Sequence, residues 1–578
     1  MQFWQGESGM NAFMIILILI LFLIWRSVSL EGKKREARAD QYRAQFGSVP
    51  DKELTEVRRH RLEGFLARYA GKNESLMDQA TWDDLEMDRV FRRMDSCKSG
   101  AGEEVLYTQL HRISSDGETL NRLDKIAATA TAMDDSRIRA QMALSDLGFT
   151  GKYSVSDYLD YLTGSENNGI LIHLIPDLLY LPAILLCFVH LSIGAFALMA
   201  IISLQVIVYF RERSKMEHTL TGFSYLMRLN RCAAAILKEE SLLSQTPDLY
   251  GDLKETESAL SDLRRGGKYV IFSGRNGAGS VMGGSGIAES MVSLLNMLFH
   301  IDLILYSRIR NKIRGRSDDI FRLICLVGTI DAGISLASFR ESLKSVWCRP
   351  IFLKDGRDLA LKKGYHPLLE NPVPADITVG NKGILLTGSN ASGKSTFLRM
   401  VGINAVLAQT VYTCTAEGYA APGFRIFSSI AISDNLKDGE SYFMAEIRSL
   451  KRILDASDKD EAPVLCFVDE VLRGTNTVER ISAGCEILRS FVGKGILCFA
   501  ATHDLELTQL LADCYENYHF RESFEGEDVH FSYQLMQGPG ASRNAIRLMA
   551  QTGFDPEIVK HAGALAADLE KGNLSARG

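Results

Sequence analysis

A short glycine-rich motif constrains the possible fold of this chain more than any other feature. Residues 388–395 read GSNASGKS, which matches the phosphate-binding loop pattern G-x-x-x-x-G-K-[ST]. The motif follows an apolar segment, 384–386, and precedes a helix-forming stretch from Lys394, so it has the strand–loop–helix context in which it works. Glycines allow backbone N–H groups to surround phosphate oxygens, and the helix N-terminus adds positive potential. The sequence therefore predicts an α/β domain that binds ATP or a related nucleotide.

The same motif supplies predicted contacts for both phosphate and metal. Lys394 can reach the β- and γ-phosphates, and the Ser395 hydroxyl can ligate Mg²⁺. The predicted nucleotide contacts in and after the loop are Gly388, Ser389, Asn390, Ala391, Ser392, Gly393, Lys394, Ser395 and Thr396.

Two apolar segments downstream each end in polar residues. Residues 464–469 read VLCFVD, the continuous apolar pattern of a buried parallel strand, and Asp469 falls at its carboxyl end, where ligands bind in open α/β sheets. We expect Asp469 to hold Mg²⁺ through water and Glu470 to orient the attacking water. A second apolar strand, 496–501, leads to His503, which is predicted to sense the γ-phosphate.

An apolar stretch near the N-terminus predicts a membrane anchor. In the stretch from Met10 to Trp25, one residue, Asn11, is clearly polar. Basic residues follow the stretch at Lys33, Lys34, Arg35 and Arg38. A cleaved signal peptide carries its charge before the apolar run, so this pattern favours an uncleaved anchor, with a buried core helix as the alternative. The positive-inside rule then places the following residues in the cytoplasm.

A second apolar stretch predicts a membrane hairpin. Residues 169–210 are rich in Leu, Ile, Val, Phe and Ala. One crossing needs about 20 residues, so two crossings fit, with a turn at Ser192 and Gly194; a single long tilted helix is the alternative. Asp177 opposes insertion, because a carboxylate at a helix centre costs about 2.5–3.5 kcal/mol. An even number of crossings keeps the flanking regions on the same side.

The segments around the hairpin are predicted to be helical and polar. Residues 31–168 and 216–262 carry apolar residues at three- and four-residue spacing, as does the segment 51–70.

A glycine-rich segment, 266–286, is interpreted as a flexible loop rather than a second nucleotide site, because no crossover unit surrounds it. Arg308 to Arg316 is strongly basic, which fits nucleic-acid phosphate, anionic lipid or a solvated helix end. The net charge of −6 gives no overall basic character that would indicate nucleic-acid binding.

Taken in order, the motifs resemble the MutS family of ATP-binding-cassette ATPases over roughly residues 310–562. No L-S-G-G-Q signature of transporter-type cassettes is present. A weaker resemblance to the family's core and lever segment begins at Asp78-Gln79-Ala80-Thr81 and is interrupted by the predicted hairpin. The markers of the resemblance are Gly364-Tyr365-His366-Pro367, the phosphate loop with Thr396, Ser441 to Glu446, Asp469-Glu470, Gly474-Thr475-Asn476-Thr477, Thr502-His503 and Phe531 to Gly538 followed by Ala545.

The resemblance implies a homodimer with two composite ATP sites. Ser441 of one subunit would contact the γ-phosphate held by the other, Asn476 would lie at the dimer seam, and Tyr533 would stack on the base. The chain departs from the mismatch-reading members of the family, since a membrane anchor stands where their Phe-x-Glu wedge domain would be. Its phosphate loop also has Ala391-Ser392-Gly393 where the family usually has Met-Gly-Gly.

Together these observations predict a multi-pass protein of the cell membrane whose P-loop ATPase domain, of the ATP-binding-cassette type, is cytoplasmic and joined to a mostly helical core and lever region. Its catalytic residues are Lys394, Glu470 and His503, its cofactors are ATP and Mg²⁺, and DNA is the expected partner. The alternative is a mechanical or regulatory ATPase that acts on an unidentified protein partner without DNA. The predicted divisions are an anchor (1–30), a helical cytoplasmic region (31–168), a transmembrane hairpin (169–212), a lever-like region (213–350) and the ATPase domain (351–578).

Overall fold

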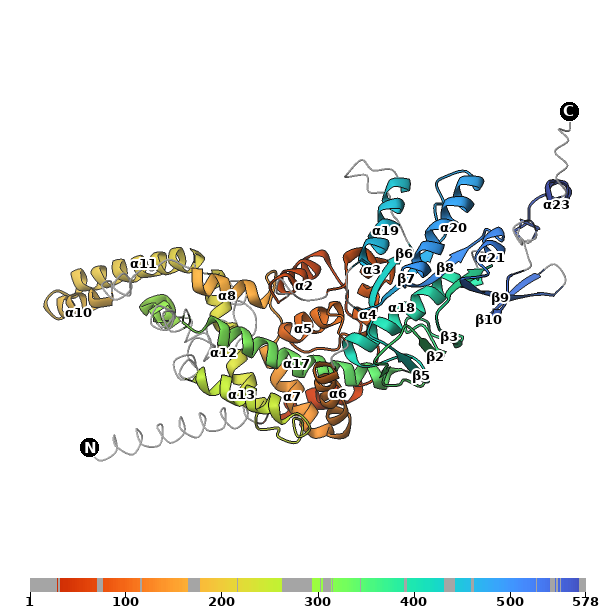
Figure 1. Cartoon of the computed structure of the whole chain (residues 1–578). Coiled ribbons are helices and arrows are strands. Elements are labelled where there is room, and N and C mark those ends of the chain that lie inside the picture. The colour runs from red at the N-terminus through yellow and green to blue at the C-terminus, as the bar shows by residue number, and fades with distance from the viewer. Residues whose placement is uncertain are drawn as a thin grey trace.

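The molecule is elongated, with a helical hairpin at one end and a sheet-containing domain at the other (Figure 1). Nearly all of the predicted anchor and the whole glycine-rich segment 266–286 lie outside the described residues. The computed structural model describes residues 29, 32–69, 76–114, 117–164, 177–215, 217–261, 294–301, 303–304, 313, 315–343, 345–388, 392–430, 442–458, 462–525, 528–540, 546, 549–550 and 552–570.

The middle of the molecule is a helical region built around one long buried helix, α17. This helix packs against α5 and α6 through a face of Leu, Ile, Val and small residues. The predicted helix 51–70 begins later, at Glu56, because Thr55 Oγ1 accepts a hydrogen bond from the Arg58 amide and so caps the helix. The helices are α2 (Glu56–Tyr69), α3 (Gln79–Asp84), α4 (Met87–Met94), α5 (Gly100–His111), α6 (Gly117–Ala132), α7 (Asp134–Leu147), α8 (Val155–Gly164), α12 (Glu217–Ile236), α13 (Pro247–Ala259) and α17 (Ser317–Ser342).

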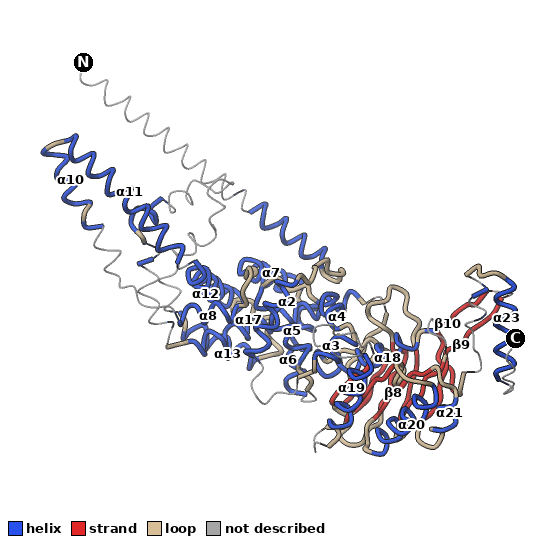
Figure 2. The backbone as a smooth tube through the Cα atoms, turned by 90° about the horizontal axis from the view of Figure 1, so that it is seen from above, coloured by secondary structure: helices blue, strands red, loops and turns tan. Residues whose placement is uncertain are grey.

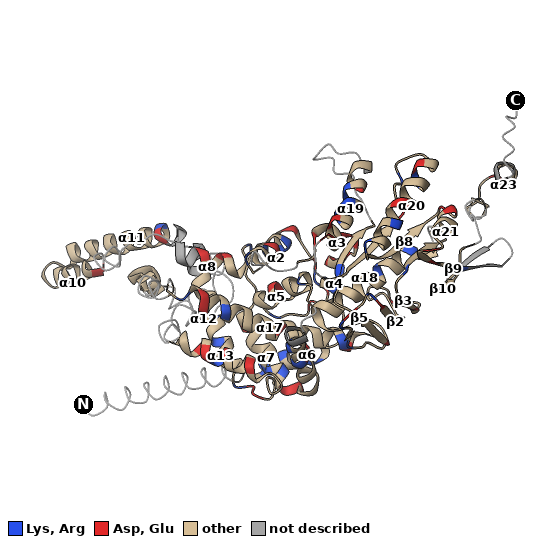
Figure 3. Cartoon of the chain, in the orientation of Figure 1, with Lys and Arg blue, Asp and Glu red and all other residues tan. Residues whose placement is uncertain are grey.

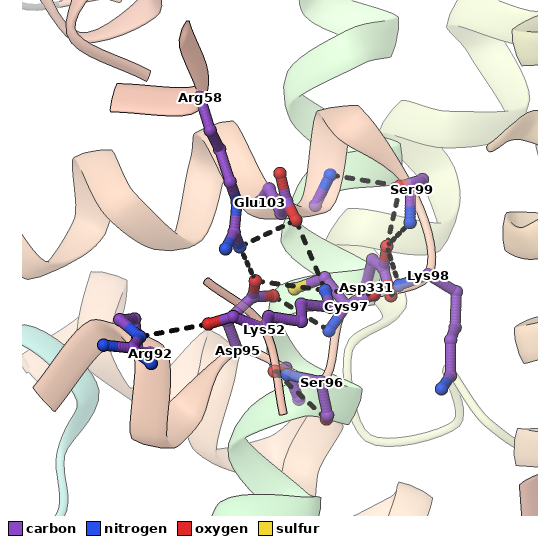
Figure 4. A network of polar contacts seen from close by, with 12 residues as sticks. Lys52, Arg58, Arg92, Asp95, Ser96, Cys97, Lys98, Ser99, Glu103 and Asp331 are labelled. Carbon is purple, nitrogen blue, oxygen red and sulfur yellow. Dashed lines mark hydrogen bonds and ion pairs between the residues drawn. The ribbon is translucent and has the colours of Figure 1, made fainter. Parts of the chain in front are cut away.

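A buried polar network fixes α17 to the start of α5 (Figure 4). Asp331 of α17 accepts hydrogen bonds from the Ser99 hydroxyl at 2.6 Å and from the amides of Ser99 and Lys98 at 2.8 and 3.1 Å. Its carboxylate therefore holds Ser99, the N-cap residue whose hydroxyl oxygen accepts a hydrogen bond from the Gly102 amide of α5. Beside it, Lys52 reaches Asp95 at 3.0 Å, which joins the segment before α2 to the same network.

The domain at the other end contains two sheets. The six-stranded sheet has the order β10-β9-β4-β8-β7-β6, in which β10 is antiparallel and the other pairs are parallel. The smaller sheet has the order β1-β5-β2-β3. The strands are β1 (Ile351–Phe352), β2 (Leu359–Gly364), β3 (Ala375–Val379), β4 (Gly383–Thr387), β5 (Gly418–Ala421), β6 (Arg425–Ser429), β7 (Val464–Asp469), β8 (Leu497–Thr502), β9 (Tyr515–Glu525) and β10 (Asp528–Gln537).

Helices cover both faces of the larger sheet, so its central strands are apolar throughout. Alternate residues of β4 enter different cores, with Ile384 and Leu386 in one and Leu385 in the other. Because β4, β7 and β8 are parallel, their carboxyl ends meet at one edge of the sheet. The helices of this domain are α18 (Lys394–Val411), α19 (Tyr442–Ala456), α20 (Thr477–Gly493), α21 (Glu506–Leu510) and α23 (Pro556–Glu570).

The opposite end of the molecule is a pair of helices, α10 (Tyr180–Val189) and α11 (Leu191–Lys215), which lie side by side (Figures 1 and 2). The turn predicted at Ser192 and Gly194 is wrong. The helices are separated at His190, whose extended backbone ends α10, and Gly194 lies in the first turn of α11. Its missing side chain permits close packing, since a Cβ there would lie 2.4 Å from the Cys187 backbone nitrogen.

The hairpin presents apolar side chains to its surroundings. Figure 3 shows few charged residues along either helix. The carboxylate of Asp177 has a hydrogen-bond partner within the hairpin, because its Oδ1 accepts from Gln205 Nε2 at 2.9 Å. Among the described residues, Leu191–Glu212 and Ser317–Ser342 are long and apolar enough to cross a membrane. Exposed apolar residues of the hairpin include Leu181, Leu185, Phe188, Val189, Leu191, Ile193, Phe196, Met199, Leu204 and Ile207.

Candidate active site

The phosphate loop leads from the end of β4 to the first residue of α18. Gly388 and Gly393 have φ angles of +144° and +104°, which are unfavourable for residues with a side chain. A Cβ on Gly388 would lie 2.8 Å from Ser392 Oγ, so this glycine also leaves room for the wound loop. Lys394 is buried, and its Nζ donates a hydrogen bond to the Gly388 carbonyl at 2.6 Å. The loop thus holds a lysine ammonium at the helix N-terminus, where anions bind readily.

Asp469 ends β7 next to the start of α18. Its Oδ2 accepts a hydrogen bond from Ser395 Oγ. Its buried Oδ1 accepts no hydrogen bond from the described residues and lies 4.0 Å from Arg473 Nη2. A hydroxyl and a carboxylate are the hard oxygen donors that Mg²⁺ prefers. The residues predicted to serve the metal therefore meet, and an Asp469 oxygen without a hydrogen bond among the described residues fits an ion at this place.

Glu470 follows Asp469 and lies between two basic side chains. Its Oε1 is 2.6 Å from His503 Nε2, and its Oε2 is 2.5 Å from Arg473 Nε. Burial acts to raise the pKa of Glu470, but the hydrogen bond to His503 and the nearby charges of Arg473 and Lys394 outweigh it and lower this pKa. Glu470 is thus held ionised, as a group that orients and polarises water must be.

His503 connects the carboxylate side of the site to the phosphate loop. It follows β8, and its Nε2 lies 3.4 Å from Lys394 Nζ. Lys394 begins the helix after β4, and Asp469, Glu470 and His503 lie at or just after the ends of β7 and β8. The sheet edge thus brings together side chains that are as much as 109 residues apart.

A cavity of about 370 Å³ lies beside the phosphate loop. Tyr533 of β10, with a φ of +54°, forms one wall, and its ring lies 3.2 Å from the position of a Cβ on Gly393. Burial lowers the pKa of His366 on another wall to about 4, so this imidazole is neutral near pH 7. The volume and mixed lining suit a planar heterocycle. The cavity is lined by His366, Leu369, Glu370, Asn371, Pro372, Val373, Ala375, Gly393, Thr396, Phe397, Met400, Phe520 and Tyr533.

Comparisons with known proteins agree with this geometry. Residues 384–570 match the family model MutS domain V. "DNA mismatch repair protein MutS" of Nitratidesulfovibrio vulgaris is 30% identical over 306 residues, which are 50% of this chain and 33% of that protein. "DNA mismatch repair protein MutS 2" of Haloarcula marismortui is 29% identical over 295 residues, which are 46% of this chain and 30% of that protein. "DNA mismatch repair protein MutS" of Thermus aquaticus is 28% identical over 264 residues, which are 45% of this chain and 32% of that protein.

Residues 384–570 thus form a domain of the MutS domain V type, and the similarity to MutS proteins extends over about half of the chain. The chain spans about a third of the length of the curated relatives that it matches. The matched residues include β4, β7, β8 and the site at their carboxyl ends. The comparison therefore supports the MutS-type fold for this domain.

Not every residue predicted to serve this MutS-type site is part of the described geometry. Ser389, Asn390, Ala391 and Ser441 lie outside the described residues. Asn476 is the N-cap of α20, where its side chain accepts a hydrogen bond from the Glu479 amide at 3.0 Å. Its place at a dimer seam stays a prediction, as do the catalytic and binding roles of the other residues.

Sequence reasoning gave no role to two residues of the site. His366 belongs to a motif that was noticed as a family marker, but its place in the cavity wall depends on the smaller sheet, which brings the motif next to the phosphate loop. Arg473 stands three residues after Glu470, a spacing that is compatible with their ion pair in a tight turn. That spacing was the available signal, and the turn itself could not be read from it.

Proposed function

We propose that this chain is a membrane-anchored, MutS-type ATPase that hydrolyses ATP as a homodimer. The observation that carries the proposal is the meeting of Lys394, Asp469, Glu470 and His503 at one sheet edge, with Glu470 held between two basic groups. Phosphoryl transfer depends mainly on positioning and charge neutralisation, and these residues supply both.

Each of these side chains has a defined part in hydrolysis. Lys394 would bind the β- and γ-phosphates, and Ser395 and Asp469 would hold Mg²⁺, which would neutralise phosphate charge. Glu470 orients the attacking water, and His503 holds the Glu470 carboxylate while it faces the γ-phosphate. The cavity beside Tyr533 receives the base. In the dimer, Ser441 of the partner subunit would complete the phosphate site, and Asn476 would lie nearby.

The membrane part of the proposal rests on α11. Only 11% of its most apolar window is buried within the molecule, so its surface suits lipid rather than water. We place the hairpin α10–α11 in the cell membrane and the ATPase domain in the cytoplasm, where ATP is available. Residues 1–30 provide the second attachment in this proposal.

One route for mechanical coupling runs through α17. Arg340, near the end of this helix, donates hydrogen bonds to Thr413 Oγ1 at 2.8 Å and to the Tyr412 carbonyl at 3.2 Å, just after α18. It also pairs with Asp124 of α6 at 2.8 Å. A shift of α18 on nucleotide binding would therefore act directly on α17, whose 26 residues extend about 39 Å toward the hairpin end.

A second route runs through α3. The Asp84 carboxylate accepts hydrogen bonds from Ser428 Oγ at 2.7 Å and from the Ile430 amide at 2.9 Å, at the end of β6. The Asp84 carbonyl also accepts from Arg399 Nε of α18 at 2.8 Å. The helical region thus contacts both the phosphate-loop helix and the strand that precedes the segment carrying Ser441.

DNA is the first candidate substrate. The relatives are named as DNA mismatch repair proteins, and these names support DNA as a partner of the present chain. Of the basic run Arg308 to Arg316, the described arginine is Arg316, which donates to the Ala259 carbonyl. If the run binds phosphates, affinity should fall steeply with salt.

The second candidate is ATP-driven work on a membrane protein partner without DNA. It is favoured by the position of the hairpin, which interrupts the helical region between α8 and α12 and lies at the end opposite the ATPase domain (Figure 1). In this case closure of the dimer would move the hairpin rather than clamp DNA.

One assay separates the candidates. ATP hydrolysis by the purified full chain would be measured in detergent and in lipid nanodiscs, with plain, mismatched and branched DNA at low and high salt. Salt-sensitive stimulation by DNA supports the first candidate, whereas stimulation by lipid with no DNA binding at low salt supports the second. Glu470→Gln should bind ATP and lose about 100-fold or more in rate, and Lys394→Ala should lose ATP binding. A chain that hydrolyses no ATP under all these conditions contradicts the proposal.

A further inference from the structure

Two cysteines lie opposite each other where the helical region joins the ATPase domain. Cys348 is in the segment between α17 and β1, and Cys414 follows α18. The Cys348 amide donates to the Cys414 carbonyl at 3.0 Å, and the Cys414 amide donates to the Cys348 carbonyl at 2.8 Å. Opposed residues of such an antiparallel bridge have Cα atoms about 5.5 Å apart, a separation that a disulfide can span.

The two thiols differ in exposure and in acidity. Cys348 is partly exposed, whereas Cys414 is fully buried. A hydrogen bond from the Cys414 thiol lowers the pKa of Cys348, while burial raises the pKa of Cys414. A thiolate-forming cysteine with access to solvent reacts readily with a peroxide, and a second thiol beside it can complete a disulfide.

The pair lies among contacts that connect α17 to the nucleotide cavity. Arg340 of α17 donates to Thr413 Oγ1 at 2.8 Å, one residue before Cys414. One residue after it, Thr415 accepts from the Tyr365 amide at 2.9 Å and donates through Oγ1 to the Tyr365 carbonyl at 2.7 Å. The next residue, His366, lines the cavity beside the phosphate loop.

A covalent bond at this place would change the junction as well as fix it. Opposed Cβ atoms in an antiparallel pair lie about 4.5–5.5 Å apart, whereas those of a disulfide lie about 3.5–4.5 Å apart. Bond formation therefore draws the segment after α17 toward the segment after α18.

We propose that Cys348 and Cys414 are a modification site, at which a peroxide forms a reversible disulfide that restrains the junction between α17 and the ATPase domain. Formation of the bond is independent of the proposed function, whereas its effect on ATP hydrolysis rests on that function.

The reaction consumes one peroxide molecule and both thiols. The Cys348 thiolate sulfur attacks a peroxide oxygen, so that an S–O bond forms, the O–O bond breaks, and the released hydroxide takes up the proton lost by Cys348 to give water. The Cys414 sulfur then attacks the sulfur of the Cys348 sulfenic acid. The S–S bond forms, the S–O bond breaks, and the departing hydroxide takes the Cys414 proton to give a second water. A dithiol restores both thiols by exchange.

The first measurement is mass spectrometry of the full-length protein in lipid nanodiscs. The protein is treated with hydrogen peroxide, with or without later dithiothreitol, and its remaining thiols are alkylated in urea. Cys466 and Cys498 are the matched control, because they are register partners in β7 and β8 and both are fully buried. We expect peptides joined through Cys348 and Cys414, their loss with dithiothreitol, and alkylated Cys466 and Cys498. Cys348→Ser should give no joined peptides.

The second measurement is steady-state ATP hydrolysis by the same samples. We expect oxidation to lower the kcat of the wild type by about 10-fold, because a covalent restraint opposes movement during turnover, and dithiothreitol to restore it. Cys348→Ser should stay within about two-fold of the reduced wild type, as a substitution outside the core usually does, and peroxide should not change its rate.

Three outcomes separate the claims. Absence of the joined peptides, or equal oxidation of Cys466 and Cys498, contradicts a specific disulfide site. A disulfide that leaves kcat unchanged contradicts the restraint. A reduced wild type that hydrolyses no ATP contradicts the proposed function instead, and mass spectrometry still decides whether the disulfide forms.

Discussion

Helices α17 and α11 are similar in length and apolar character, yet they lie in opposite surroundings. Both could cross a bilayer by length and composition, but 78% of the most apolar window of α17 is buried inside the molecule, against 11% of that of α11. α17 is surrounded by α5, α6 and α13, while α11 contacts α10 and His300 and has exposed apolar side chains elsewhere. The comparison teaches that apolarity alone does not distinguish a core helix from a membrane helix; the distribution of neighbours does.

The largest expected effect on the free energy of unfolding comes from an Ile→Asp substitution, made once in each of the two helices. Ile330 of α17 is fully buried and Ile202 of α11 is 41% exposed. Ile330→Asp should lower the free energy of unfolding by about 4 kcal/mol or more, because it places a charge in the core. Ile202→Asp should change it by less than about 0.5 kcal/mol but reduce recovery in membranes, where the carboxylate costs about 2.5–3.5 kcal/mol.

Urea unfolding in detergent and membrane fractionation would measure the two effects, with Ile330→Val and Ile202→Val as controls. If Ile202→Asp destabilised the helical region as much as Ile330→Asp, α11 would be a core helix and the comparison would fail.

A titratable group in the middle of α17 gives the next effect. Burial raises the pKa of Asp331 to about 6 from an ordinary value of 3.8, against the opposing hydrogen bonds from Ser99. A raised pKa means that the folded state holds this proton more tightly than the unfolded state. Ionisation of Asp331 therefore lowers the free energy of unfolding as the pH rises from about 4 to about 6, by about 3 kcal/mol in total.

Asp331→Asn removes this titration. The stability of the variant relative to wild type should therefore increase by up to about 3 kcal/mol between pH 4 and pH 7, as measured by urea unfolding at both ends. Asp146→Asn, at an exposed position, is the control and should show little change. A constant difference between Asp331→Asn and wild type across this range would contradict a buried, titrating Asp331.

The smallest effect concerns glycines at close helix contacts. A Cβ on Gly328 of α17 would lie 2.6 Å from the Ala101 carbonyl oxygen, and one on Gly194 of α11 would lie 2.4 Å from the Cys187 nitrogen. Gly328→Ala should lower the free energy of unfolding of the core by about 1–3 kcal/mol. Gly194→Ala should leave core unfolding unchanged and instead speed amide hydrogen exchange in α10. Equal effects on core unfolding would show that the hairpin and core are one cooperative unit.

How far the sequence predicts this molecule depends on the range of the contacts involved. The phosphate loop, Asp469 and His503 were predictable because each belongs to a local pattern in which a strand ends in polar residues. These residues were expected to lie close together because the carboxyl ends of parallel strands meet at one edge of the sheet. The strand 464–469 occupies the predicted residues, and the strand before His503 is shifted by one residue.

Other features depend on contacts that no local pattern contains. Asp331 holds the N-cap residue of a helix that begins 231 residues earlier, at Gly100, and Glu446 holds an amide 26 residues away. The sequence predicts the hairpin turn at Ser192 and Gly194, but the helices separate at His190, and Gly194 instead allows close packing against Cys187. Similarly, α17 and α11 differ in what surrounds them, which composition does not record.

The central claim is that α11 lies in lipid while α17 forms the protein core that joins it to the ATPase domain. It is tested most directly with a photo-crosslinking phenylalanine analogue placed in the full-length, membrane-embedded chain at Phe196 of α11, 74% exposed, or at Phe339 of α17, 2% exposed. The account predicts that illumination joins position 196 to phospholipid and position 339 only to this chain. Lipid adducts at both positions, or protein adducts without lipid at position 196, would contradict it.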